Sequence, residues 1–137
     1  MLDPRPFQNY GLLVRMHDWL TDPVPEDLSS APKLSDYTIA VDGMGLLRLV
    51  AQVCGHPRLG DSWITTSPIW QIDPQGMFAR TSSRWYRLSG GFRESIEANA
   101  DPKTIAMAEQ FLSTTDAIAH LGYIRSIVDR ELRRRAN

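Results

Sequence analysis

Arginine and aromatic side chains recur together in residues 77–88, which read Met-Phe-Ala-Arg-Thr-Ser-Ser-Arg-Trp-Tyr-Arg-Leu. In an extended strand every second side chain points to the same side, so Arg80, Arg84 and Tyr86 would share one face in any pairing register. Guanidinium groups beside aromatic rings bind phosphates and bases in single-stranded nucleic-acid binders, and these residue types are also enriched at protein interfaces. The sequence therefore predicts a partner-binding surface composed of Arg58, Trp70, Arg80, Arg84 and Tyr86.

A purely structural role competes with this interpretation. Arginine stems often lie along apolar sheet faces with the charged group in water, and a small sheet needs bulky aromatic residues for its core. The two interpretations differ in one observable. A binding surface requires exposed side chains, whereas a structural role buries the rings and pairs the guanidinium groups with internal acids.

Candidates for catalysis or metal binding are few. Cys54 and His56 lie two residues apart and would point the same way in a strand, but no local pattern supplies the third group and oxyanion site that a nucleophilic pair needs. One cysteine and three dispersed histidines, His17, His56 and His120, disfavour a metal site. The sequence contains no glycine-flanked serine elbow and no glycine-rich phosphate loop. We therefore expect a protein that is not an enzyme and that binds neither cofactor nor metal.

Composition bounds the class of protein. The chain has 137 residues, of which 42% are hydrophobic and 23% charged, and this favours a single domain over residues 1–137. The net charge of −1 gives no global case for nucleic acid, although residues 46–91 and the C-terminal run 133–135 are locally basic. No apolar stretch approaches a membrane span and the first residues lack the order of a secretory signal, so we expect a soluble, cytoplasmic protein with no membrane partner.

Hydrophobic spacing and proline positions predict helices at both ends. Apolar residues recur every three or four positions from Phe7 to Leu20, which indicates an amphipathic helix that ends before Pro23. Residues 1–36 would comprise this helix and a proline-rich linker. An Asp-Pro pair opens a helical segment over residues 101–135, and the cap-forming residues 113–116 leave open whether it is one helix or two.

Residues 46–54 are ambiguous. Their apolar positions fit either a strand or a short helix that ends at Gly55. Arg48 and Gln52 fall on the same alternating face, and the turn residues that follow come too early for a helix of mean length. Both observations favour the strand.

Two later runs, 63–72 and 77–88, are rich in β-branched and aromatic residues and predict a hairpin. The Asp-Pro-Gln-Gly segment between them suits a turn with a glycine bulge, which would place Trp70 near Arg80. The proline within the first run cannot donate to a ladder, so we expect an edge position or a bulge there. The expected fold class is α+β, with a three-stranded antiparallel meander over residues 46–88 covered by the N- and C-terminal helices.

Three stretches carry a resemblance to known proteins: Gly55-His56-Pro57-Arg58-Leu59-Gly60-Asp61, Ile64-Thr65-Thr66-Ser67-Pro68 and Ala79-Arg80-Thr81-Ser82-Ser83-Arg84-Trp85-Tyr86-Arg87-Leu88. They resemble the shared core of a family of small uncharacterised proteins from α-proteobacteria, a domain of unknown function. The family has no established activity that could be carried over to residues of this chain. Related short hairpin proteins often accompany phage and plasmid genes, so the resemblance implies a regulator or inhibitor that works by binding.

We therefore expect a small, non-catalytic, cytoplasmic binding or regulatory protein of a phage or mobile-element setting, which contacts a protein partner through the arginine and aromatic side of its sheet. The alternative is a protein that binds single-stranded nucleic acid with the same surface and the arginine-rich C-terminus, with an affinity that falls steeply as salt rises. The apolar stripe from Ile118 to Leu132 could also pair with a second copy and form a homodimer through the C-terminal helix.

Overall fold

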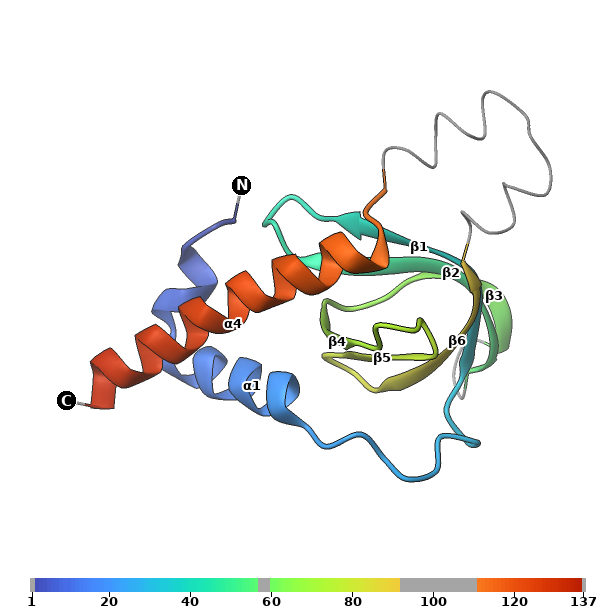
Figure 1. Cartoon of the computed structure of the whole chain (residues 1–137), viewed down its shortest axis with the longest axis horizontal. Helices are drawn as coiled ribbons and strands as arrows, with labels where there is room; N and C mark the ends of the chain where they lie inside the picture. The colour runs from blue at the N-terminus through green and yellow to red at the C-terminus, as the bar shows by residue number, and fades with distance from the viewer. Residues whose placement is uncertain (1, 57–59, 92–110, 137) are drawn as a thin grey trace.

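The computed structural model describes residues 2–56, 60–91 and 111–136, with only the backbone described for 54–56 and 60–62. Within these ranges the chain forms a short 3-10 helix, two α-helices and one curled six-stranded sheet (Figure 1). The element bounds are η1 Arg5–Gln8, α1 Tyr10–Thr21, β1 Lys33–Val41, β2 Leu47–His56, β3 Gly60–Thr65, β4 Ile69–Ile72, β5 Phe78–Thr81, β6 Trp85–Gly91 and α4 Thr114–Ala136.

The sheet is mixed, and the three-stranded antiparallel meander was wrong. Its strands follow the order β3-β2-β1-β6-β5-β4, with β1 and β6 parallel and the other neighbours antiparallel. The two edge strands, β3 and β4, are joined only by residues 66–68, so the sheet must curl to bring its edges together. Thr66, the first residue of this link, continues the pairing of β3 with β2, because its backbone N–H donates to the Leu49 carbonyl at 2.9 Å and its hydroxyl accepts from the Leu49 N–H at 3.1 Å. The protein is nevertheless α+β, as expected.

Each of the two long predicted strands is in fact two strands. The run 63–72 breaks after Thr65, and the run 77–88 breaks at a tight turn in which the Thr81 N–H donates to the Arg84 carbonyl at 2.9 Å. Proline and serine at these breaks are poor strand residues that favour turns. The strand expected over residues 46–54 is confirmed as β2.

The central strand β1 lay partly in the expected linker and was missed. It pairs with β2 on one side and β6 on the other, but its burial does not alternate regularly. Asp36 interrupts the alternation, because it adopts a positive φ of 49° where the pairing register with β2 shifts. A period-of-two search therefore fails on this strand.

The register of the β4–β5 hairpin also differs from the expectation. Gln71, not Trp70, is the neighbour of Arg80, and the register shifts between Ile69 and Gln71. Pro68 itself lies outside any strand, in the link between β3 and the edge strand β4, so the edge or bulge position expected for it within a strand is not what the structure has.

The helices expected at both ends are confirmed over the described residues. The Asn9 side chain caps α1 by accepting from the Leu12 N–H at 2.9 Å. Ser113 caps α4 by accepting from the Asp116 N–H at 3.1 Å, so α4 begins within the segment where a break was considered. Residues 101–110 lie outside the described residues. No helix in the described part of the chain has the length and apolar character needed to cross a membrane.

The two helices pack against each other and against β4, beside the sheet (Figure 1). The buried faces of both helices and of the sheet form one apolar cluster, which includes Leu13, Met16, Leu34, Leu47, Leu49, Val53, Ile69, Ile124 and Val128. Within the stripe considered for a homodimer, Leu121, Ile124 and Val128 face this core. The stripe is therefore largely used inside the chain.

The turn between β1 and β2 joins three parts of the molecule. Its Asp42 carboxylate accepts from the Met44 and Leu46 N–H groups at 2.8 and 3.0 Å and from the Arg48 Nε at 2.8 Å. The Met44 carbonyl accepts from the Asp3 N–H at 2.8 Å, which ties the N-terminal segment to the turn. On α4, the His120 Nε2 lies 2.7 Å from the Gly45 carbonyl oxygen.

Candidate binding surface

The two aromatic residues of the predicted surface are buried. Trp70 and Tyr86 are each 3% exposed. The Trp70 ring stacks on Trp19 of α1 at a centroid distance of 5.4 Å, and its Nε1 donates to the Ser82 hydroxyl at 2.8 Å. Burial raises the pKa of the Tyr86 hydroxyl, and the charge of Arg84 offsets part of that rise. Neither ring is available to a partner.

Arg80 holds the end of α1 against the sheet. Its Nε donates to the Asp22 carboxylate at 2.9 Å, and its NH1 group donates to the Thr81 carbonyl at 2.8 Å. Trp85 Nε1 donates to the same carboxylate oxygen of Asp22 at 3.0 Å. The Gln71 amide adds contacts to the backbone carbonyls of Trp19 and Asp22. Arg80 therefore has an internal acid as its partner, as the structural alternative required.

The other two predicted arginines do not complete the surface. Arg84 sits in the turn between β5 and β6, half-buried, and its Nε is shielded from solvent without a hydrogen-bond partner among the described residues. Arg58 lies outside the described residues. The structure thus does not bring the five predicted residues together as one exposed group.

A different set of arginine and aromatic side chains shares the outer face of the sheet. The turn at residues 82–84 changes the parity of the chain, so that Phe78 pairs with Arg87 and Arg80 pairs with Trp85. The rings of Phe78 and Trp85 lie 5.9 Å apart, and both remain partly exposed. Lys33 extends this face on β1. We call Lys33, Phe78, Arg80, Trp85 and Arg87 the outer patch.

Two cations of the outer patch are neighbours on adjacent strands. Lys33 is the register partner of Arg87 across the parallel strands β1 and β6. Arg87 Nε donates to the Ala31 carbonyl at 2.9 Å, which fixes the direction of its guanidinium group. Within the described residues, neither the Lys33 ammonium nor the rest of that guanidinium group has a hydrogen-bond or ion-pair partner. Neighbouring like charges on adjacent strands repel, so this pair favours an anionic ligand.

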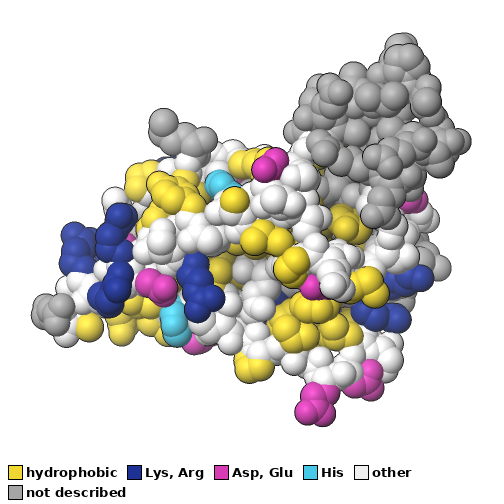
Figure 2. All heavy atoms as spheres, in the orientation of Figure 1, with side chains coloured by type: hydrophobic (Ala, Val, Ile, Leu, Met, Phe, Trp, Pro, Cys, Tyr) yellow, Lys and Arg dark blue, Asp and Glu magenta, His cyan; other side chains and the backbone are white. Residues whose placement is uncertain are grey.

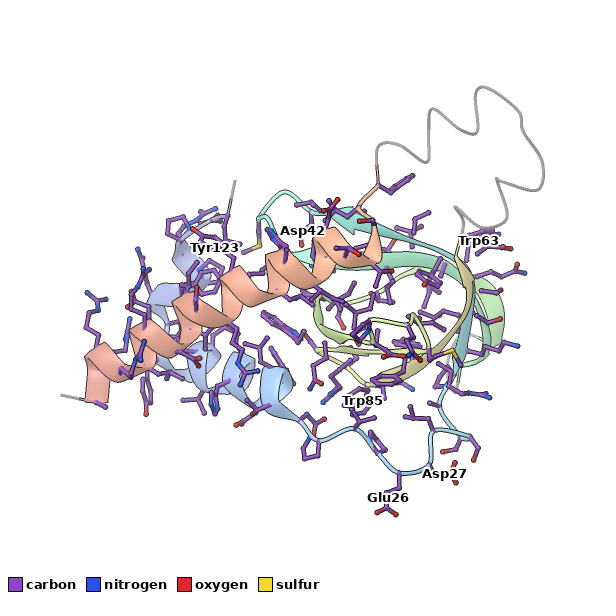
Figure 3. All side chains as sticks on the ribbon, in the orientation of Figure 1. Glu26, Asp27, Asp42, Trp63, Trp85 and Tyr123 are labelled. Carbon is purple, nitrogen blue, oxygen red and sulfur yellow. The ribbon has the colours of Figure 1, made fainter. Side chains whose placement is uncertain are left out.

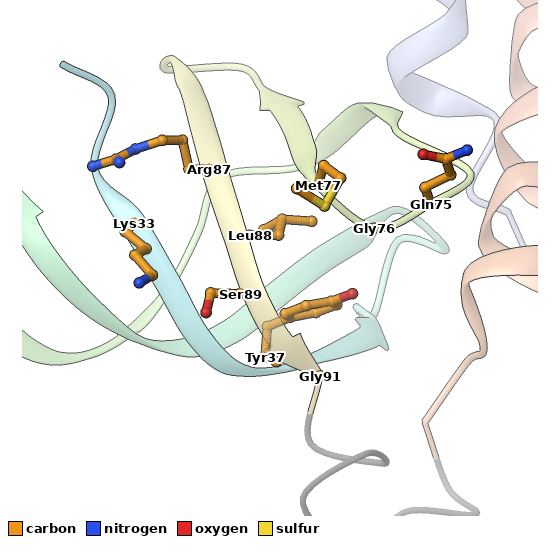
Figure 4. Close-up of a pocket in the computed structure, with 10 residues that line it drawn as sticks. Lys33, Tyr37, Gln75, Gly76, Met77, Arg87, Leu88, Ser89 and Gly91 are labelled. Atoms are coloured by element: carbon orange, nitrogen blue, oxygen red, sulfur yellow. The ribbon is translucent and has the colours of Figure 1, made fainter. Parts of the chain in front are cut away.

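A pocket opens beside these cations, at the end of β6 that extends beyond β5 (Figure 4). It has a volume of about 510 Å³, and among the described residues no acid lines it. The lining comes from β1, β6 and the β4–β5 turn and consists of Lys33, Tyr37, Gln75, Gly76, Met77, Arg87, Leu88, Ser89, Gly90 and Gly91. Cations lie at one side of the pocket and the Tyr37 ring at the other (Figure 4).

Gly76 shapes this pocket, and its replacement with alanine is expected to destabilise the protein by about 1–2 kcal/mol. Its φ is +71°, and an added Cβ would lie 2.9 Å from the Tyr37 hydroxyl oxygen. Urea denaturation measures the loss. Gly43→Ala is the matched control, because a Cβ there meets nothing within 4 Å. Equal stabilities of the two variants would contradict the close approach.

The sequence did not predict the outer patch, because the alternation of side chains was followed from residue 77 to residue 88 as if the strand were unbroken. An unbroken strand over 77–88 places Tyr86 with Arg80, whereas the turn places Trp85 there. The adjacent serines Ser82 and Ser83 are the one sequence signal for that turn. Their hydroxyls are used structurally, with Ser83 Oγ 2.9 Å from Ser67 Oγ.

The described residues offer no cluster of metal ligands. They contain no group of three or more His, Cys, Asp or Glu side chains that could hold a metal ion. His17 is on α1 and His120 on α4, and the latter is committed to the Gly45 carbonyl. The side chains of Cys54 and His56 are outside the described set. The arrangement can bind and orient an anion, through cations and hydroxyl groups.

The fold and this face define a class: small α+β proteins with a curled mixed sheet, two packed helices and a cationic outer pocket. The chain belongs to a family of unknown function (DUF6634), whose model matches residues 14–134. The match runs from α1 to near the end of α4 and so includes the whole outer patch. No curated protein and no solved structure matches the chain.

Proposed function

We propose that the protein is a non-catalytic binding protein that takes a protein partner on the outer patch. One observation supports this most strongly: an aromatic pair lies on one sheet face with two cations that have no acidic partner among the described residues. Exposed aromatic residues and arginine are the side chains most enriched among energetically important interface residues. An acidic partner segment would neutralise Lys33 and Arg87 while its apolar residues cover Phe78 and Trp85.

We also propose where the protein acts and what kind of system it regulates. A regulator or inhibitor of a phage or mobile-element system, in the cytoplasm of an α-proteobacterium, would act by such a contact and would need no catalytic group. The resemblance of residues 55–61, 64–68 and 79–88 to small α-proteobacterial proteins supports this setting.

Single-strand nucleic-acid binding is the second candidate, because cations also gather at the C-terminal end of α4 (Figure 2). That end and β6 lie at opposite ends of the molecule (Figure 1), so the two basic regions form separate surfaces. Part of the arginine run is also engaged, since Arg134 pairs with Glu131 at 2.6 Å and Arg135 donates to the Gln8 carbonyl at 2.7 Å. We therefore rank protein first.

Capture of the partner from host cells tests the proposal. The tagged full chain, treated with nuclease, should recover a defined protein, and Phe78→Ala or Arg87→Glu should each reduce its yield at least about tenfold. Tyr123→Ala and Arg125→Glu are matched controls, since Tyr123 is an exposed aromatic residue and Arg125 an exposed arginine, both on α4. Patch variants that capture as much as the controls would contradict the proposal. Recovery of nucleic acid alone, lost at moderate salt, would favour the second candidate.

A further inference from the structure

The pocket beside the β4–β5 turn has an excess of positive charge that the described fold does not use. Lys33 and Arg87 contribute two cations, and the part of the lining that the structure describes contains no acid. Other arginines of the sheet do have acids: Arg80 pairs with Asp22 at 2.9 Å, and Arg48 pairs with Asp42 at 2.8 Å. An unneutralised pair held on adjacent strands is costly unless a ligand supplies the charge.

The remaining lining completes a mixed polar and apolar site. Ser89 and Tyr37 provide hydroxyl groups, and the backbone of three glycines borders the opening. Met77 and Leu88 provide apolar surface on the side of the β4–β5 turn (Figure 4). Gly76 and Gly91 both lie against the Tyr37 ring, so the ring is held in position at the far wall from the cations.

We propose that this pocket binds a small phosphate monoester. Two cations match the dianion that a phosphate monoester carries above its second pKa of about 6, whereas a carboxylate or sulfate would neutralise only one. A guanidinium group fixed by its Nε contact to Ala31 still presents its two terminal nitrogen atoms, which suit phosphate oxygens. The organic part of the ester would lie against Tyr37, Met77 and Leu88.

This ligand site goes beyond the proposed partner contact and is tested without any partner. The probes are phenyl phosphate and phenyl sulfate, which have the same ring and similar shape but differ by one charge. Calorimetric titration of the purified full chain at about pH 8 and constant ionic strength should give roughly tenfold tighter binding of phenyl phosphate. Near about pH 5 the phosphate becomes a monoanion, and the preference should disappear.

Two variants locate the binding. Lys33→Gln and Arg87→Gln should each weaken phenyl phosphate roughly tenfold at the higher pH and remove most of its preference over phenyl sulfate. Arg125→Gln, on α4, is the matched control and should leave both affinities unchanged. Equal affinities of the two probes at the higher pH, binding insensitive to both pocket variants, or no saturable binding of either probe would each overturn the proposal. Both proposals use Lys33 and Arg87, but the titrations contain no partner, so failure of partner capture and failure of phosphate binding are observed separately.

Discussion

Replacement of Asp42 with alanine is expected to lower the free energy of unfolding by about 2–4 kcal/mol, the largest effect of any polar substitution that we consider. The variant loses one charge-assisted hydrogen bond from Arg48 and two backbone hydrogen bonds that shape the β1–β2 turn. It also leaves the guanidinium group of Arg48 beside the Thr66 carbonyl without its acid. Since this turn joins the N-terminal segment, α4 and the 66–68 link, its loss would loosen all three.

Urea denaturation measures this effect, and Asp27→Ala is the matched control. Asp27 is exposed and accepts one backbone N–H, from Ser29 at 2.8 Å, so its removal should cost less than about 0.5 kcal/mol. An Asp42→Ala variant as stable as the Asp27→Ala variant would show that the turn does not depend on the carboxylate.

The same carboxylate makes stability depend on pH. Burial by itself raises the pKa of Asp42, but hydrogen bonds from Arg48, Leu46 and Met44 outweigh it, so the pKa lies below its ordinary value. The folded state therefore binds this proton less readily than the unfolded state. The stability that Asp42 contributes is complete above the unfolded pKa of about 3.9 and is lost as the pH falls through the lower folded pKa. The stability difference between the native protein and Asp42→Asn should shrink in that acid range and stay constant between about pH 6 and 8.

Replacement of Arg80 with alanine is the second large effect, a loss of about 2–3 kcal/mol. Its side chain is only 16% exposed, and its removal leaves the Asp22 carboxylate with Trp85 as its one remaining hydrogen-bond donor among the described residues. The Thr81 carbonyl loses its contact with the guanidinium group as well. The end of α1 would keep its hydrogen bonds from Gln71 and Trp85 and the stack of Trp19 on Trp70, but it would lose its ion pair with the sheet.

A double-mutant cycle in urea isolates the Arg80–Asp22 pair. Arg80→Ala, Asp22→Ala and the double variant should give a coupling of about 1–2 kcal/mol. Arg87→Ala is the matched control on the same face, and it should cost less than about 1 kcal/mol because it loses one hydrogen bond to Ala31. Additive effects of the Arg80 and Asp22 substitutions would contradict a stabilising interaction between these two side chains.

Local patterns predicted the elements with a clear period or clear caps. The spacing of Leu13, Met16 and Leu20 identified α1, because these residues face the core once per turn. Arg48 and Gln52 identified β2, because they lie on one alternating face of the strand and buried apolar residues lie on the other. These signals are local, so a single sequence carries them.

Topology depended on contacts that local patterns do not encode. β1 lies in the middle of the sheet between β2 and β6, but its bulge at Asp36 hides its period. The parallel pairing of β1 with β6 joins segments separated by the whole β2–β5 region. The meander was the simplest arrangement of consecutive strands, and it left no place for such a pairing.

For the candidate site too, the sequence indicates the residue types, whereas the contacts between them depend on the tertiary structure. Residue type drew the prediction to arginine and aromatic residues between Trp70 and Arg87, but a single turn places Trp85 and Arg87 on the outer face and Tyr86 in the core. Asp22, which engages Arg80, is 58 residues away in the chain. No spacing rule could distinguish the structural Arg80 from the uncompensated Arg87.

Photo-crosslinking from the outer patch tests the central claim most directly. A photoactivatable benzoylphenylalanine at position 78 keeps the aromatic character of Phe78, whose partly exposed ring lies 5.9 Å from that of Trp85. Figure 3 labels Trp85 and the comparison residue Tyr123, which lie on different parts of the molecule. Irradiation in host cells should yield one discrete protein adduct from position 78 and none from the matched exposed position 123 on α4. An adduct that forms from position 123 and not from position 78 would contradict a partner-binding role for this face.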